Sequence, residues 1–167
     1  MATDIVSWIA VGMILATSAT ILISRDWRVP LGALAVQYIA AFWLVTRHLP
    51  FVMGSAKLIT GWMVVAALGM TRLGLTSTEE SADETSLLSG RWFRATLIGI
   101  VALVSIGATS RIETSIPGLG LQVIAGSLIL IGAGVIHLGV TSDVLRVTLG
   151  LLTMLTGFEI LYAAVES

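Results

Sequence analysis

The chain has 167 residues, of which 56% are hydrophobic and only 11% are charged, and its formal net charge is −1. A typical soluble domain is about 45–50% apolar and about 25% charged, whereas the mean hydropathy here is +0.99. The composition excludes a water-soluble enzyme, and the missing basic excess excludes a nucleic-acid-binding protein. The absence of Cys excludes disulfides, thiolate zinc sites and iron–sulfur clusters. We therefore expect no bound cofactor or metal.

Six hydrophobic runs follow one another along the chain. They span residues 5–24, 29–45, 51–71, 95–108, about 119–138 and 147–165. A membrane helix needs about 20 apolar residues, so six such helices would use roughly 120 of the 167 positions. Backbone groups in lipid must be satisfied within their own segment, and barrel strands would be about half as long. The sequence predicts an all-α, multi-pass membrane protein with about six transmembrane helices.

The residues outside these runs suffice only for termini and short loops, so residues 1–167 are predicted to form a single transmembrane domain. Its parts are then a first three-helix module (residues 1–72), a cytoplasmic loop (73–94), a connector helix and turn (95–118) and a final helix pair (119–167).

Basic residues are distributed unequally between the connecting loops. The first, third and fifth loops hold six Arg residues, whereas the opposite side holds two, Arg47 and Arg111. Basic residues favour the cytoplasmic side of a membrane, and acidic residues contribute little to orientation. We therefore expect the odd-numbered loops, with the acidic segment 77–84, in the cytoplasm and both termini outside. The expected location is the inner (plasma) membrane of a prokaryotic cell. His48 and His137 then lie on opposite faces and cannot bind one haem together.

Two charged residues lie inside hydrophobic runs. Lys57 is six residues into the third run, and Glu159 is twelve residues into the sixth. At 1.5 Å per residue, each lies roughly 9 Å from the outer boundary. An ionisable group at such a depth costs at least about 2.5–3.5 kcal/mol on insertion scales. Both residues are therefore candidate functional groups.

Each of these two residues has more than one interpretation. Glu159 is either a protonated acid that bonds to a neighbouring helix, a proton-path carboxylate whose neutral form is favoured by desolvation, or a lone lipid-facing group. Lys57 either extends toward the headgroups, pairs with another group, or takes part in charge transfer. A direct pair of the two is allowed by depth, but nothing in the sequence places the third and sixth helices side by side.

Three further polar residues are possible accessory groups. Gln37, in the second run, can bond across helices or stabilise a water molecule. His137, with Asp143 shortly after it, lies near the cytoplasmic end of the fifth run and can pass protons inward. A structural role is the simpler interpretation of Gln37 and His137. Small residues in the last two runs permit close helix approach, namely glycines 126, 132, 134, 150 and 157.

The segment from Thr141 to Ala164, with Gly157-Phe158-Glu159-Ile160-Leu161 near its centre, resembles the small K-type membrane subunit of complex I. That subunit has a helix, a short basic cytoplasmic turn, and a helix with a glutamate near mid-membrane. The resemblance matches Glu159 with the family's buried proton-path glutamate. Two features depart from the family. Tyr162-Ala163 replaces its asparagine, and the family's third helix, which carries a second carboxylate, would have to follow Ser167, the last residue given.

The first half of the chain resembles the longer E component of group-4 membrane hydrogenases. The resemblance rests on Arg28, Gln37 and the segment 54–59 (GSAKLI) around Lys57. In those proteins three extra helices precede the K-like part, and one of them carries a lysine. We expect a further helix to complete the last helix pair, supplied either by chain beyond Ser167 or by another subunit.

The two resemblances imply a subunit that catalyses nothing alone. It would belong to the membrane arm of a complex I-related assembly (NADH:quinone oxidoreductase or hydrogenase-like), beside antiporter-like subunits and in contact with the lipid bilayer. Glu159 and Lys57 would contribute to a proton or sodium path. One alternative is the small subunit of a multi-subunit cation/proton antiporter. Another is a structural accessory subunit of a different energy-transducing complex.

The Cys-free sequence allows the expected topology to be tested with single cysteines. In intact cells, an impermeant thiol reagent is expected to label a cysteine at position 3 and to leave one at position 80 unlabelled. Permeabilised cells, in which both positions react, are the control. Labelling at position 80 alone would contradict the topology.

Overall fold

The computed structural model describes residues 2–24, 26–74, 90–116 and 118–166, and these residues form six helices. The helices are α1 (Ala2–Ile23), α2 (Arg28–Val45), α3 (Phe51–Gly74), α4 (Arg91–Ser115), α5 (Leu121–Val140) and α6 (Val144–Glu166). Each of the six is long and apolar enough to cross a membrane. The prediction of an all-α chain with six candidate membrane helices is confirmed.

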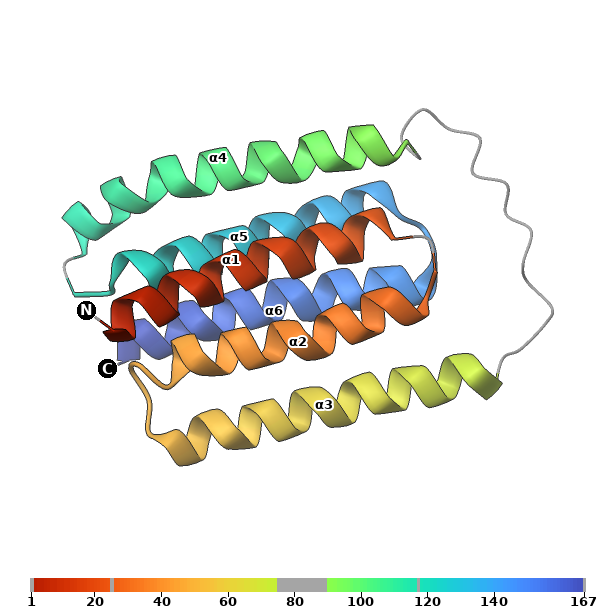
Figure 1. Ribbon diagram of the computed structural model, residues 1–167, viewed down its shortest axis with the longest axis horizontal. Coiled ribbons are helices and arrows are strands. Elements are labelled where there is room, and N and C mark those ends of the chain that lie inside the picture. Colours follow the sequence, from red (N-terminus) through yellow and green to blue (C-terminus); the bar gives the residue numbers. More distant parts are fainter. Residues whose placement is uncertain (1, 25, 75–89, 117, 167) are drawn as a thin grey trace.

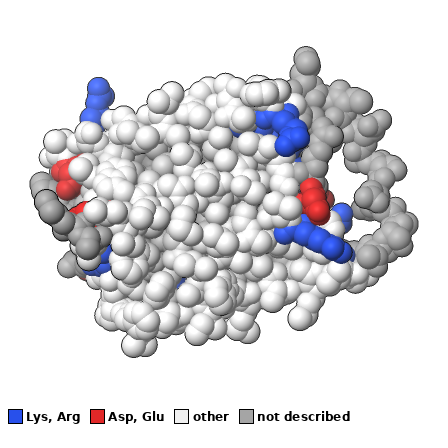
Figure 2. Space-filling model, viewed as in Figure 1, with Lys and Arg blue, Asp and Glu red and all other residues white. Residues whose placement is uncertain are grey.

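The helices run side by side and alternate in direction (Figure 1). Both termini lie at one end of the bundle, together with the α2–α3 and α4–α5 connections, and we call this the N/C end. The α1–α2 and α5–α6 connections lie at the opposite end. In Figure 2 the charged side chains gather mainly at these two ends, with a broad band of uncharged atoms between them. Which end faces the cytoplasm stays a prediction.

Four helices form the centre of the bundle. α5 packs against α6, α1 and α4, and α2 packs against α1 and α6. The largest apolar cluster joins these central helices and contains the fully buried side chains of Ile14, Leu44, Ile124, Leu130 and Ile160. α3 and α4 lie on the flanks of this core, α3 against α2 and α4 against α5 and α1 (Figure 1).

Small residues bring the backbones of α5 and α6 into direct contact. A Cβ atom placed on Gly134 would lie 2.8 Å from the carbonyl oxygen of Gly150. One placed on Gly157 would lie 2.8 Å from the carbonyl oxygen of Ser127. Backbone atoms cannot move aside as the end of a flexible side chain can, so only glycine fits at these positions. The prediction that glycines of the last two runs permit close helix approach is confirmed at these positions.

The fourth helix is longer at both ends than the apolar run 95–108 predicted, because α4 extends from Arg91 to Ser115. Arg94, which the sequence placed in the preceding loop, lies in its first turn and is 4% exposed. Its Nη1 donates a hydrogen bond to the carbonyl oxygen of Leu22 at 3.2 Å. The last carbonyls of a helix lack partners and carry partial negative charge, so a cation there is stabilised. Arg94 therefore anchors α4 to the end of α1.

Alanine at Gly157 is expected to destabilise the bundle. Its Cβ would meet backbone atoms of Ser127 and Ile131 within 2.9 Å, and overpacking of this kind costs about 1–3 kcal/mol. Gly12 in α1 is the control, since a Cβ there meets nothing within 4 Å and alanine favours a helix. Thermal unfolding in detergent should show a lower midpoint for Gly157→Ala and no loss for Gly12→Ala. Equal midpoints would refute the close contact.

Candidate functional site

Lys57 and Glu159, the two charged residues inside the predicted runs, form an ion pair. The Nζ atom of Lys57 in α3 lies 3.8 Å from Oε1 of Glu159 in α6. The lysine side chain is 35% exposed and that of the glutamate 50% exposed at the surface of the isolated chain. The sequence allowed this pair by depth but could not place α3 beside α6. The structure brings the two residues together, while their role in ion transport stays a prediction.

The position of Lys57 follows from how α3 packs on α2. Gly54 and Gly61 are the two buried residues of α3. A Cβ on Gly61 would lie 2.7 Å from the ring of Tyr38, and one on Gly54 would lie 2.6 Å from Cγ2 of Thr46. Residues three and four positions apart share a helix face, so Lys57 lies on the same side of α3 as these glycines. α3 therefore directs the lysine toward the core helices.

A hydrogen bond adds to the contact between α3 and α2. The indole Nε1 of Trp62 donates to the carbonyl oxygen of Ala35 at 3.1 Å. The rings of Phe42 and Phe51 also meet edge to face, with centroids 5.5 Å apart, near the connection between the two helices. These contacts lie on both sides of Lys57 along α3, and they hold the middle of this helix against α2.

A small pocket between α2, α3 and α6 contains the ion pair. Its polar lining consists of Tyr38, Lys57, Thr156 and Glu159. Its apolar lining consists of Ala41, Phe42, Val45, Gly54, Leu58 and Ile160. We call it the α2–α3–α6 pocket. The hydroxyl of Thr156 donates to the carbonyl oxygen of Leu152 at 2.7 Å, so its hydrogen-bonding need is met within α6.

The pocket lies well inside the apolar band. Lys57 is six residues after the start of α3, and Glu159 is seven residues before the end of α6. At 1.5 Å per residue, both lie about 9–10 Å from the N/C end. A proton can pass from the ammonium to the carboxylate without changing the net charge of the pair, because both forms sum to zero. The pair can therefore hold a proton in two arrangements of equal net charge.

The other predicted accessory residues lie elsewhere. Gln37 is 1% exposed in the core and does not line the pocket, although Ala41, one helical turn along α2, does. His137 is 3% exposed near the opposite end, where a Cβ on Gly150 would lie 3.2 Å from its Cδ2. Gly150 precedes Glu159 by nine residues, or about 13 Å along α6. The structure therefore places His137 away from the ion pair and Gln37 outside the pocket lining.

Asp143 has a local structural role in the part of the chain that the structure describes. The side chain is exposed at the start of α6, and its Oδ2 accepts a hydrogen bond from the backbone N–H of Arg146 at 3.4 Å. A carboxylate at this position satisfies an N–H group that has no partner within the helix. Within the described ranges, no group of three or more His, Asp or Glu side chains is arranged to hold a metal ion.

Tyr38 and Thr156 are lining residues that the sequence analysis missed. Thr156 precedes Glu159 by three positions, so the helical repeat places both on one face of α6. That spacing is a signal the sequence contains. For Tyr38, the sequence contains no comparable signal, because it does not show that the ring in α2 packs against Gly61 in α3.

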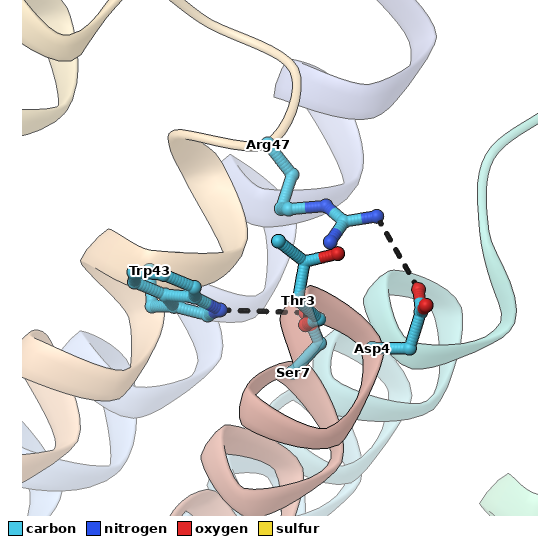
Figure 3. A network of polar contacts seen from close by, with 5 residues as sticks. All are labelled: Thr3, Asp4, Ser7, Trp43 and Arg47. Atoms are coloured by element: carbon cyan, nitrogen blue, oxygen red, sulfur yellow. Dashed lines mark hydrogen bonds and ion pairs between the residues drawn. The ribbon is translucent and has the colours of Figure 1, made fainter. Parts of the chain in front are cut away.

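A second polar network ties α1 to α2 at the N/C end (Figure 3). The Nε1 of Trp43 donates to the hydroxyl oxygen of Ser7 at 3.3 Å, and that hydroxyl donates to the carbonyl oxygen of Thr3 at 2.9 Å. Arg47 and Asp4 form an ion pair at 3.8 Å beside it. The network fixes the start of α1 against the end of α2.

No protein-family model, no curated protein and no solved structure matches this chain. The resemblance to K-type subunits and to hydrogenase E components therefore stays a prediction that rests on the quoted sequence segments.

The contact between α3 and α6 can be measured in the Cys-free chain. With cysteines replacing Lys57 and Glu159, a short bis-maleimide is expected to join the two helices in bilayers. Adding Gly61→Ala should lower the cross-linked fraction several-fold, because the new methyl group would lie 2.7 Å from the ring of Tyr38 and displace α3. Gly69→Ala is the control, since its nearest neighbour lies at 3.9 Å. Equal cross-linking in both variants would show that Gly61 does not position the lysine.

Proposed function

We propose that this protein is a multi-pass membrane subunit whose Lys57–Glu159 pair forms part of a proton or sodium path in a complex I-related assembly. The observation that carries the proposal is the ion pair itself. It joins two helices that are long and apolar enough to cross a membrane, within the apolar band of the bundle.

The energetics of the pair favour a functional interpretation. Each ionisable group at this depth costs about 2.5–3.5 kcal/mol on insertion scales. Pairing offsets part of that cost, but a well-packed apolar pair of similar volume is often as stable or more stable. Stability alone therefore gives little reason to have a lysine and a glutamate here. A group that must gain and lose a proton does give such a reason.

The open side of the pair supports a path that continues into a neighbouring subunit. Both side chains are partly exposed on the flank of the isolated chain, between α3 and α6. In a membrane this flank faces either lipid or another protein, and a charged pair is far less costly against polar groups of a partner. Protonation of one buried group alters the proton affinity of its neighbours. A lateral relay between subunits can operate in this way.

A structural function is the second candidate, and one observation favours it. α3 packs mainly on α2, and the ion pair links it to α6. In this interpretation the pair only holds α3 in place, and the protein is an accessory subunit. The two candidates differ in whether the titratable proton matters.

Replacing the titratable group separates the two functions. Glu159→Gln retains shape and hydrogen bonding, so the assembly should remain intact while proton translocation falls by about tenfold or more. Glu159→Asp keeps an ionisable group one methylene back and should retain part of the activity. Glu166→Gln is the matched control, because it makes the same change on an exposed residue at the end of the same helix. The measurements are proton translocation in membrane vesicles and a native gel of the complex.

Full translocation by an assembled Glu159→Gln variant would overturn the ion-path proposal and leave the structural function. Loss of the complex in that variant, with assembly rescued by the charge exchange of Lys57→Glu with Glu159→Lys, would also favour the structural function.

A further inference from the structure

Four buried polar side chains have no hydrogen-bond partner among the described residues. One is His137 in α5, and the other three are Ser18 in α1, Gln37 in α2 and Thr153 in α6, which are 3%, 1% and 3% exposed. In these three residues the unpartnered atoms are both hydroxyl oxygens and both the Oε1 and Nε2 atoms of the glutamine. We propose that these three side chains hold water in the interior of the bundle.

Several other buried hydroxyls are satisfied within their own helix. Thr17 donates to the carbonyl oxygen of Met13 at 2.8 Å, and Thr109 donates to that of Ser105 at 2.7 Å. Such bonds to the preceding turn are the usual way in which a helix satisfies a hydroxyl group. Ser18 and Thr153 make no such bond, so their hydroxyls remain available to a ligand in the core.

The three residues occupy one layer across the bundle. Ser18, Gln37 and Thr153 each lie one helical turn toward the N/C end from a member of a single apolar cluster. Those members are Ile21, Leu34 and Leu149. On the other side of the layer lies the largest apolar cluster, which includes Ile14, Ala41 and Ile160. A polar layer therefore separates two apolar clusters in the centre of the bundle, where α2 packs against both α1 and α6.

Hydrogen-bonding chemistry identifies the occupant. A buried polar group without a partner costs about 1–3 kcal/mol, and the amide of Gln37 alone has two donor hydrogens and one acceptor oxygen to satisfy. A buried water molecule typically makes about three hydrogen bonds and both donates and accepts, so it can bridge an amide and two hydroxyls. The three side chains bring no negative charge to balance a cation. Water fits this set of groups.

The proposed water lies close to the α2–α3–α6 pocket. Thr153, Thr156 and Glu159 follow one another at three-residue spacing on α6, so each lies about 4.5 Å along the axis from the next. Gln37 is adjacent in sequence to Tyr38 of the pocket lining. Thr153 itself is six residues, or about 9 Å along the axis, from Glu159, so water at Thr153 lies one helical turn beyond the pocket lining at Thr156. The water site does not depend on the proposed function.

The sequence allows a direct test, because Gln37 and Gln122 are its only two glutamines and it has no asparagine. Protein labelled with ¹⁵N in its glutamine side chains and placed in bilayers should give two amide signals in solid-state NMR. Magnetisation transfer from water should reach both signals. Gln122, partly exposed at the start of α5, is the positive control. A Gln122→Ala variant assigns the two signals.

Thr153→Val and Ser18→Ala remove the two hydroxyl partners and should lower the water transfer to Gln37 several-fold while that to Gln122 stays constant. No transfer to Gln37 in the unmodified chain would overturn the proposal. A shift of the Gln37 signal on exchange of sodium for potassium would also overturn it, because a cation would then occupy the layer. Normal water transfer to Gln37 together with full proton translocation by Glu159→Gln would support the water site and refute only the proposed function.

Discussion

A polar group that cannot reach water must find a partner inside the protein, and this constraint explains the main features of the bundle. Arg94 meets it by donating to the carbonyl oxygen of Leu22 at the end of α1. Lys57 and Glu159 meet it by pairing across two helices. Gln37 has no hydrogen-bond partner among the described residues, and we propose that water meets this need. The apolar runs determine which segments form helices, and the few buried polar side chains form specific bonds between those helices.

Hydropathy predicted six helices long and apolar enough to cross a membrane, and the sequence positions placed Lys57 and Glu159 well inside two of them. The glycines of the last two runs predicted close helix approach, which is seen at Gly134 and Gly157. These patterns could not predict the ion pair, because the hydrophobic pattern of α3 and α6 says nothing about which helices are neighbours. The start of α4, at Arg91 and not at position 95, was missed for a related reason. A charged residue such as Arg94 marks the end of an apolar run, although its side chain can be buried when the end of another helix accepts its hydrogen bond.

At the site, α3 is packed closely on α2, but the ion pair between α3 and α6 remains partly exposed. Gly54 and Gly61 bring α3 close to α2 and direct Lys57 toward α6, yet the pair stays partly exposed on the isolated chain. Exposing such a charged pair to lipid costs free energy, whereas polar groups of a partner protein would lower that cost. This flank between α3 and α6 therefore links the internal geometry of the chain to the multi-subunit assembly in which we propose that it works.

The contact between the ring of Tyr38 and Gly61 also determines the register of α3. The aromatic ring fills the space that a side chain would occupy on α3, so the helix can neither slide along α2 nor turn about its axis without losing this contact. Successive residues of an α-helix point about 100° apart. A slip of one position would therefore turn Lys57 away from α6. The packing of the Tyr38 ring on α3 thus keeps Lys57 within reach of Glu159.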